Sequence, residues 1–330
     1  MQDGFGRTID YMRISITDRC NLRCRYCMPE QIETVAMSEI LTYEEITTVV
    51  REAAEIGITR VKITGGEPLV RRDASRLIGM LKDVPGIREV TLTTNGILLS
   101  EQLEELIQAG VDSINISLDT LDPERYHQIT GFDCLDRVKE GLDAALASGV
   151  PVKINAVSLK REDVEPLVAL TKERPLDVRF IELMPIGMGK GFRGLPHDEL
   201  IPWIKEQFAE GQDPESGLHP DETRHGNGPA VYYRIPGYRG SIGFISAIHG
   251  KFCDSCNRIR LTSQGFLKSC LCYDTGVDVK GVLRDSLPDE KRRVGVRNCL
   301  EKCIMSKPGA HSFLHMEQVS EQHTMSAIGG

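Results

Sequence analysis

The stretch Tyr11-Met-Arg-Ile-Ser-Ile16 is a β-rich run, and it leads directly through Thr-Asp-Arg into Cys20-Asn-Leu-Arg-Cys24-Arg-Tyr-Cys27. From here to about residue 185, β-rich runs alternate with amphipathic segments that are typical of helices. Six consecutive strand–helix units predict parallel strands with helices packed outside them, in an open sheet or a full or partial barrel. The expected strands are residues 11–16, 60–64, 90–94, 113–118, 152–157 and 178–183.

The segments between these runs have the marks of helices. Thr42 and Glu45 form a capping-box pattern, in which the two side chains satisfy free backbone amides reciprocally. Several segments end near a glycine, as helix C-termini often do. The expected helices are residues 42–56, 74–82, 101–109, 135–148 and 162–171.

Chemically distinctive residues follow the expected strands at their ends. In parallel α/β folds, ligands collect at the carboxyl ends of the strands. Such residues at five strand ends therefore predict a site at this edge of the sheet. They are Cys20, Gly65-Gly-Glu-Pro68, Thr93-Thr-Asn95, Ser117-Leu-Asp119, and Glu182 with Met184.

Cys20, Cys24 and Cys27 place three thiols within eight residues. A tight loop of this kind can hold three corners of an iron–sulfur cubane, whose irons prefer thiolate sulfur. No fourth cysteine lies nearby in the sequence, so one iron would stay open to a substrate or cofactor. The alternative is a zinc site completed by a distant ligand, although structural zinc sites are normally built from Cys-x-x-Cys pairs.

A second group of cysteines lies at Cys253, Cys256 and Cys270. A zinc ribbon completed by Cys272 is an open alternative on spacing alone. Arg258 and Arg260 follow the cysteine pair and share one side of an extended segment, because strand side chains alternate. Their guanidinium groups suit the bidentate recognition of phosphate oxygens.

The composition limits the classes of function. A net charge of −8 speaks against bulk attraction to nucleic acid or to anionic lipid. No apolar run has the length of a signal peptide or a membrane span, so we expect a cytoplasmic protein with no membrane partner. Ten cysteines in that compartment indicate metal binding rather than a disulfide framework.

The chain divides into two expected parts, residues 1–235 as a barrel domain and residues 236–330 as a cluster-binding and substrate-binding region. Residues 187–194 and 211–229 are rich in glycine, proline and polar residues and are expected to be loops. β-rich runs at 230–235 and 241–248 precede the second cysteine group, and a mixed helical tail follows it. Cys134 is expected in the core, and Cys299 and Cys303 can share one face of a helix.

Several motifs resemble those of known enzymes. The C-x3-C-x2-C loop with Tyr26 and the Gly65–Pro68 stretch resemble the two hallmarks of the radical S-adenosylmethionine superfamily. The longer blocks resemble the GTP 3′,8-cyclase family, the MoaA enzymes of molybdenum cofactor biosynthesis. The blocks that carry this resemblance are residues 13–29, 63–73, 92–96, 115–119, 179–182 and 252–261, with Gly329-Gly330 at the tail.

The family resemblance implies an incomplete (βα)6 TIM-type barrel with a C-terminal extension carrying a second iron–sulfur cluster, the two clusters lying at opposite mouths. It implies two 4Fe–4S clusters, S-adenosylmethionine and GTP. A 5′-deoxyadenosyl radical would abstract the ribose 3′ hydrogen, C3′ would attack C8 of guanine, and reduction would give 3′,8-cyclo-7,8-dihydro-GTP. An external electron donor and a downstream cyclic pyranopterin monophosphate synthase are the implied partners, and the oligomeric state stays open, a homodimer included.

The resemblance also implies roles for individual residues. The metal ligands that the resemblance implies are Cys20, Cys24, Cys27, Cys253, Cys256 and Cys270. Its S-adenosylmethionine contacts are Tyr26, Gly66, Ser117 and Met184. Its GTP contacts are Arg13, Lys62, Thr93, Lys153, Arg179, Arg258 and Arg260, the last two also being the catalytic residues that it implies.

The residues support part of this assignment independently. Lys62 and Lys153 lie in otherwise apolar strands, where a charged side chain is costly unless it meets a counter-charge. A triphosphate inside the barrel would supply one. Two other hypotheses remain: a peptide-modifying radical enzyme with an auxiliary cluster, which would usually carry more cysteines, and a zinc-binding interaction module.

Overall fold

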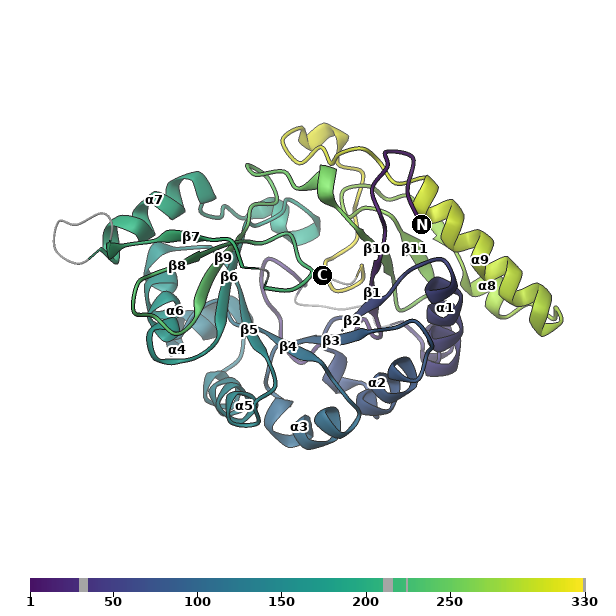
Figure 1. The fold of residues 1–330 in the computed structure, drawn as a ribbon, viewed down its shortest axis with the longest axis horizontal. Helices are drawn as coiled ribbons and strands as arrows, with labels where there is room; N and C mark the ends of the chain where they lie inside the picture. The colour runs from purple at the N-terminus through teal and green to yellow at the C-terminus, as the bar shows by residue number, and fades with distance from the viewer. Residues whose placement is uncertain (30–34, 210–215, 224, 329–330) are drawn as a thin grey trace.

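The computed structural model describes residues 1–29, 35–209, 216–223 and 225–328. Its strands form a continuous sheet in the order β12-β11-β10-β1-β2-β3-β4-β5-β6-β9-β8-β7. The sheet curves into an open ring with helices outside it (Figure 1). The six central strands are β1 (Tyr11–Ser15), β2 (Arg60–Thr64), β3 (Glu89–Thr94), β4 (Ser113–Ser117), β5 (Val152–Val157) and β6 (Asp177–Ile181), and all are parallel.

The helices that follow these strands lie on the convex side of the sheet (Figure 1). The capping box at Thr42 is confirmed, since the Thr42 hydroxyl accepts from Glu45 N and the Glu45 carboxylate accepts from Thr42 N. The five predicted helices and six predicted strands are confirmed to within two residues at either end. The helices are α1 (Tyr43–Glu55), α2 (Ala74–Lys82), α3 (Leu99–Gln108), α5 (Leu135–Ala147) and α6 (Arg161–Glu173).

Two helices were not predicted. Helix α4 (Pro123–Thr130) has clear local signals, because Asp122 caps it, Pro123 occupies its first turn, and Gly131 ends it with a φ of 78°. The second is α7 (His197–Gln207), which carries an internal proline at Pro202 that obscures its helical pattern.

Along each strand, side chains alternate between the helix-facing side of the sheet and the interior of the ring. One set of side chains faces the helices and forms the main hydrophobic core, with Met12, Ile63, Leu92, Ile116 and Phe180 all fully buried. The other set faces the interior of the ring, because successive strand residues point to opposite faces. This set contains many polar and charged residues, with Val157, Ile181 and Ile245 as apolar members near the first triad. The interior set includes Arg13, Lys62, Thr93, Asn115, Lys153, Asn155 and Arg179.

C-terminal strands extend the sheet at both edges. Strand β9 (Ser241–Ile245) lies parallel to β6, and β10 (Arg258–Leu261) lies parallel to β1. Antiparallel strands complete the edges: β8 (Val231–Arg234) and β7 (His219–Asp221) beside β9, and β11 (Phe266–Lys268) and β12 (Gly276–Asp278) beside β10. The ring is therefore an incomplete barrel, because the two ends of the strand order, β12 and β7, do not pair with each other.

Helices α8 (Lys280–Leu283) and α9 (Asp289–Met305) follow β12, and α9 packs on α1. Beyond α9 the chain returns toward the centre of the ring (Figure 1). A second, small hydrophobic cluster joins this returning segment to both edges of the sheet. It contains Ile186, Cys272, Phe313, Val319 and Ile328, with Met184 and Ile248 packed against it.

In the described part of the chain, the helices are all too short or too polar to cross a membrane.

Candidate functional site

One cavity occupies the interior of the ring, and both cysteine triads line it. The first triad follows β1 and therefore lies at the carboxyl ends of the parallel strands. The second lies at the opposite mouth, because Cys256 precedes β10 and because Cys270 is level with Arg258 in the antiparallel β10–β11 register. Of the residues with predicted roles, those lining the cavity are the six cysteines, Arg13, Tyr26, Gly66, Thr93, Ser117, Met184, Arg258 and Arg260.

The loop of the first triad is held against α4. The backbone N–H groups of Arg23 and Arg25 donate to Thr130 O and Ile129 O at 2.9 and 3.0 Å. The sulfur of Cys20 accepts from Leu22 N at 3.4 Å and from the Asn95 side chain at 3.9 Å. Helix α4, absent from the predicted fold, thus fixes the backbone that presents the three thiols.

The two triads differ in their electrostatic environment. Burial raises the pKa of Cys20 to about 11 and that of Cys27 to about 12. Burial also opposes ionisation of Cys256, but the Arg258 guanidinium and the Lys307 ammonium overcome it and lower the pKa of this thiol to about 7. Since a thiolate is the metal ligand, the first triad must release protons on loading.

The spacing of the sulfurs disfavours zinc. Among the described residues, the group of three metal-ligating side chains whose ligand atoms all lie within 4.8 Å is Asp274, Glu321 and His323, and neither cysteine triad meets this spacing. A tetrahedral zinc site with Zn–S bonds of about 2.3 Å keeps its sulfurs about 3.8 Å apart. An iron–sulfur cubane instead takes one thiolate at each of its corners, and each triad can supply three such ligands.

Gly66 packs the turn after β2 against the turn before the first triad. Its N–H donates to Thr17 O at 2.8 Å, and the next N–H, from Glu67, donates to Arg19 O at 2.8 Å. A Cβ on Gly66 would lie 2.7 Å from the carbonyl carbon of Arg19 and 2.9 Å from Asp18 O. Only glycine lets the two turns approach this closely.

We expect Gly66→Ala to lose the metal of the first triad, because the added methyl group meets backbone that leads directly into Cys20. Overpacking of this kind costs about 1–3 kcal/mol or more. Iron content after anaerobic reconstitution should fall by about half, if each triad holds one cluster. The matched control is Gly79→Ala on α2, where a Cβ has nothing within 4 Å. A Gly66→Ala protein with full iron content would contradict the assignment.

The loop after α9 surrounds the second triad. Lys307 is buried, and its ammonium donates to Arg258 O at 2.9 Å and to Ser269 O at 2.6 Å. The backbone N–H of His311 donates to the sulfur of Cys253 at 3.4 Å. From the N-terminal segment, Arg7 donates to Cys253 O at 2.8 Å. Two segments distant in sequence, the N-terminal residues and the loop after α9, therefore converge on these cysteines.

Cations form a wall on the β10–β1–β2 side of the interior. Arg260 and Lys62 flank Arg13 in the strand register. Burial lowers the pKa of Arg260 well below its usual value, and repulsion from Arg13 and Arg258 adds to this effect. Burial likewise lowers the pKa of Lys62, with Arg179 and Arg13 adding to the effect. So many neighbouring cations favour a polyanionic ligand in the interior.

Lys153 and Arg179 lie farther round the interior and have protein partners. Lys153 forms an ion pair with Asp177 at 2.9 Å and also donates to His225 O. Arg179 donates to the side chain of Asn115, while its Nε has no hydrogen-bond partner among the described residues. Lys62, Lys153 and Arg179 are not among the residues that line the cavity, so their role as substrate contacts stays a prediction.

Buried polar atoms on the cavity wall also lack partners. Thr93 Oγ1, Asn155 Oδ1 and Ser269 Oγ have no hydrogen bond within the described part of the chain. All three residues line the cavity. Buried polar groups are normally satisfied, so these atoms indicate where a ligand would bond.

Two cavity carboxylates were missed as site residues, although they stand in the motifs that the sequence analysis singled out. Glu67 accepts from Leu69 N, Asn95 N and the Thr94 hydroxyl, yet burial raises its pKa to about 7. Asp119 accepts from the Tyr26 hydroxyl at 2.6 Å and from Val157 N at 2.8 Å, and burial raises its pKa to about 6. A cationic ligand group would favour the ionised form of Glu67.

Comparison with known proteins identifies the family. Residues 14–173 match the model of the radical SAM superfamily, and residues 176–313 match the model named Molybdenum Cofactor Synthesis C. The chain is 42% identical to the GTP 3′,8-cyclase of Clostridium perfringens (strain 13 / Type A) and 44% identical to that of Alkaliphilus metalliredigens, with full coverage of each pair. The chain belongs to the GTP 3′,8-cyclase family. It is therefore an enzyme of the radical SAM type, which implies a 4Fe–4S cluster and S-adenosylmethionine.

A solved structure supports the fold. The crystal structure of Streptococcus suis SuiB bound to the precursor peptide SuiA aligns with 97% of this chain and 76% of its own, with a TM-score of 0.61 and 16% identity. At that identity the likeness concerns the fold alone. The predicted α/β fold with a C-terminal extension is confirmed, and so is membership of the family.

The four cysteines outside the two triads pack in or against the hydrophobic clusters. Cys272 is fully buried in the small hydrophobic cluster, and its sulfur accepts from Ser312 N at 3.3 Å. Cys303 is fully buried on α9, where Cys299 packs partly on the same core. Cys134 precedes α5 and packs at the edge of that core. The predicted role of Gly329-Gly330 falls outside the described residues.

Proposed function

We propose that this enzyme converts GTP to 3′,8-cyclo-7,8-dihydro-GTP, the first step of molybdopterin biosynthesis. The observation that carries the proposal is the cavity itself, which has a cysteine triad at each mouth and is lined between them by Arg13, Arg258 and Arg260. The names of the relatives, which share 41–44% of their residues with this chain over its whole length, support it.

The residues at the first mouth fit S-adenosylmethionine and a cluster. Cys20, Cys24 and Cys27 would hold three irons and leave the fourth open. With the cluster and S-adenosylmethionine bound, the chemistry supplied is a 5′-deoxyadenosyl radical that abstracts the ribose 3′ hydrogen. Tyr26, Gly66, Ser117 and Met184 would contact the methionine and nucleoside parts. Glu67 would accept from the positively charged amino group, which explains a buried carboxyl that has no cationic partner among the residues that the structure describes.

The residues between the mouths fit a triphosphate. Arg13, Arg258 and Arg260 approach one part of the cavity from two neighbouring strands. Guanidinium groups bind phosphate oxygens through paired, charge-assisted hydrogen bonds, and a dry cavity strengthens them. Thr93 Oγ1 and Asn155 Oδ1 would bond to the ribose or base. These contacts would fix C3′ and C8 close together and keep water away from a reactive radical.

The residues at the second mouth fit a second 4Fe–4S cluster with one open iron that holds the guanine. Cys253, Cys256 and Cys270 are its proposed ligands. The low pKa of Cys256 and the N–H of His311 that points to Cys253 both favour thiolate binding. Reduction also requires an external one-electron donor, and the cysteine usage supports a cytoplasmic reaction.

We expect Lys62→Met to stabilise the ligand-free enzyme by about 1–2 kcal/mol, because it replaces a desolvated charge, repelled by Arg179 and Arg13, by an apolar side chain of similar length. The gain should shrink as pH rises toward 10.5, since the unfolded chain binds more protons than the folded chain in this window. Stabilisation by added GTP should fall in the same variant. Thermal unfolding with and without GTP measures both effects.

The control for this prediction is Lys291→Met, on the exposed face of α9. It should leave the unfolding temperature and the GTP effect unchanged. A Lys62→Met enzyme that is destabilised without ligand would mean that the ammonium has a favourable partner in the protein.

The direct test of the proposal is anaerobic incubation of the reconstituted enzyme with GTP, S-adenosylmethionine and a reductant. The expected products are 5′-deoxyadenosine and a cyclised nucleotide in equal amounts. Formation of 5′-deoxyadenosine with unchanged GTP would retain the radical chemistry and exclude GTP as its substrate. A colourless protein with stoichiometric zinc would exclude the radical chemistry itself.

A further inference from the structure

A buried ion pair fastens the C-terminal segment, residues 319–328, to the second-cluster side of the barrel. Lys268 on β11 is 1% exposed, Glu321 is fully buried, and the Lys268 ammonium lies against Glu321 Oε2. The same ammonium donates to Tyr273 O at 3.1 Å, and Glu321 N donates to Cys272 O at 3.3 Å. The segment therefore starts from a fixed point beside Cys270 and Cys272.

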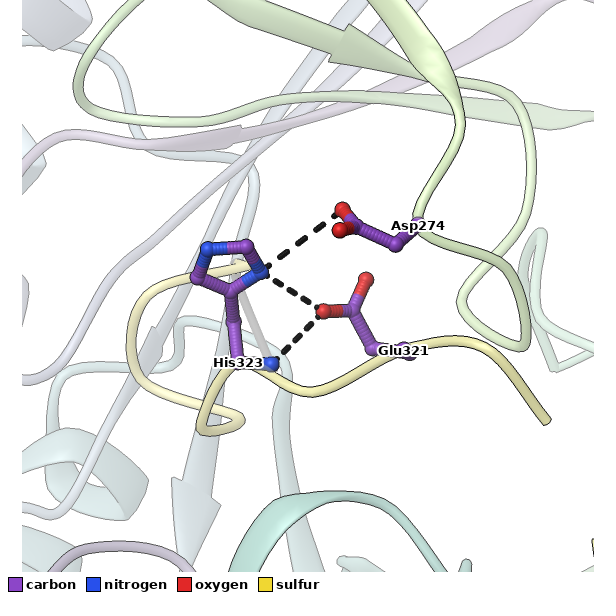
Figure 2. A group of neighbouring side chains, drawn as sticks. All are labelled: Asp274, Glu321 and His323. Atoms are coloured by element: carbon purple, nitrogen blue, oxygen red, sulfur yellow. Dashed lines mark hydrogen bonds and ion pairs between the residues drawn. The ribbon is translucent and has the colours of Figure 1, made fainter.

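The other oxygen of Glu321 organises the residues that follow. Glu321 Oε1 accepts from His323 N at 2.8 Å and pairs with His323 Nδ1 at 2.9 Å, and His323 Nδ1 lies 3.7 Å from Asp274 (Figure 2). These three side chains resemble a metal site. However, Lys268 already supplies a buried positive charge to Glu321 and lies 3.7 Å from Asp274. A metal ion would meet that charge at close range, so the cluster fits an anchor better than a cation site.

Beyond this anchor, the segment crosses the open side of the barrel. Lys190 donates to Glu321 O at 3.5 Å from the β6 edge. A Cβ on Gly187 would lie 3.0 Å from His323 O, so the segment passes directly over that glycine. Val319 and Ile328 then pack with Ile186 in the small hydrophobic cluster. The segment thus bridges the two edges that the strands leave apart.

The segment ends in the cavity beside the first triad. Met325 and Ser326 line the cavity. The backbone N–H of Ser326 donates to the sulfur of Cys27 and lowers the pKa of this thiol, which burial raises overall to about 12. Hydrogen bonds to cysteine sulfur tune the reduction potential of a bound cluster, and a closed wall excludes water.

We propose that the Lys268–Glu321 pair is a positioning device that holds residues 319–328 across the open side of the barrel and so keeps Ser326 against Cys27. Neither member of the pair lines the cavity. Both act through the segment that they anchor. The inference goes beyond the proposed function, since it concerns how the barrel is closed whatever substrate it holds.

The test compares Glu321→Gln and Lys268→Met with the unaltered enzyme. In the cluster-loaded enzyme, hydrogen–deuterium exchange of residues 319–328 should rise about tenfold in both, which is a shift of about 1.4 kcal/mol in the closing equilibrium. In the reduced, metal-free chain, alkylation of Cys27 should accelerate by a similar factor, while labelling of Cys134 stays unchanged. The double variant Lys268→Met/Glu321→Leu should return both rates toward the unaltered values, because apolar groups can replace a buried ion pair.

The matched control is Asp274→Asn, since Asp274 is exposed and its carboxylate lies 3.7 Å from both Lys268 Nζ and His323 Nδ1, while its backbone bond to Ser320 Oγ is kept. It should stay within about twofold of the unaltered rates, as for a surface charge worth little. Unchanged exchange and Cys27 labelling in a folded Glu321→Gln enzyme would overturn the proposal. So would an Asp274→Asn effect as large as that of Glu321→Gln together with protection of the segment by added Zn²⁺, because a metal site would then be the anchor.

If Glu321→Gln does not fold, Glu321→Asp gives the same comparison, because its shorter side chain withdraws the carboxylate from Lys268. Hydrogen–deuterium exchange and Cys27 alkylation do not depend on turnover. If GTP is not the substrate, the expected changes in both readouts stay the same. If the Lys268–Glu321 pair does not hold the segment, the proposal that GTP binds in the cavity is unaffected.

Discussion

Cys24→Ala should abolish 5′-deoxyadenosine formation, with a loss of at least about 10³-fold, because the protein only positions a reaction whose difficult chemistry the cofactor carries. Cys24 lies in the cavity between Cys20 and Cys27, and without its thiolate the first triad cannot hold three irons. Iron content should fall by about half, since the second triad keeps its own ligands. Iron analysis and quantification of 5′-deoxyadenosine measure the two effects.

Cys299→Ala is the matched control, since this thiol lies on α9 at the edge of the hydrophobic core and does not line the cavity. It should keep its iron and its activity. A Cys24→Ala enzyme that still cleaves S-adenosylmethionine would show that the cluster is held elsewhere, and the assignment of the first triad would then be wrong.

Arg258→Ala should weaken GTP binding about 100-fold, or about 3 kcal/mol, while S-adenosylmethionine cleavage continues. Arg258 lines the cavity from β10, its guanidinium packs over the Phe252 ring at 4.8 Å, and it shares the cation wall with Arg13 and Arg260. It lies at the second mouth, away from the proposed S-adenosylmethionine contacts. Equilibrium binding of GTP and the yield of 5′-deoxyadenosine separate the two functions.

The substitution also removes a charge that lowers the pKa of Cys256, so iron content must be measured in the same samples. Arg258→Lys is the informative companion, because it keeps the charge near Cys256 but loses the paired hydrogen bonds to phosphate. Arg88→Ala, at an exposed arginine before β3, should bind GTP normally. Unchanged GTP affinity in an iron-replete Arg258→Ala enzyme would remove this arginine from the substrate site.

The alternation of apolar and polar residues along the strands made much of the fold predictable. Met12 and Ile14 around Arg13, or Val61 and Ile63 around Lys62, are fully or almost fully buried on the helix side. The polar residue between each pair then points into the ring. Sequence patterns of this kind, with the cysteine loops, indicate both the barrel and the side of each strand that carries chemistry.

The site residues that the sequence analysis missed are placed by contacts between segments far apart in the sequence. Lys307 meets Ser269 O from 38 residues away, and Glu321 meets Lys268 from 53 residues away. Neither stands in a periodic segment or a recognisable motif, so no local pattern marks it as buried. The same holds for Ser326, which is placed against Cys27 only by the path of the returning chain.

The pairing of Lys153 with Asp177 has a similar origin. The two residues lie directly opposite each other on β5 and β6, a register that sequence alone does not provide. For Lys153, the protein itself supplies a counter-charge of the kind expected for a lysine in an apolar strand. Lys62 instead faces other cations, Arg179 and Arg13.

We propose that one cavity holds GTP with its ribose facing the first triad, where the radical would form. Anaerobic turnover with GTP carrying deuterium at C3′ tests this most directly. We expect one deuterium in the 5′-deoxyadenosine isolated with the cyclised nucleotide, and none when the label is at C8. Unlabelled 5′-deoxyadenosine from the 3′-labelled substrate, formed at the full rate, would contradict it.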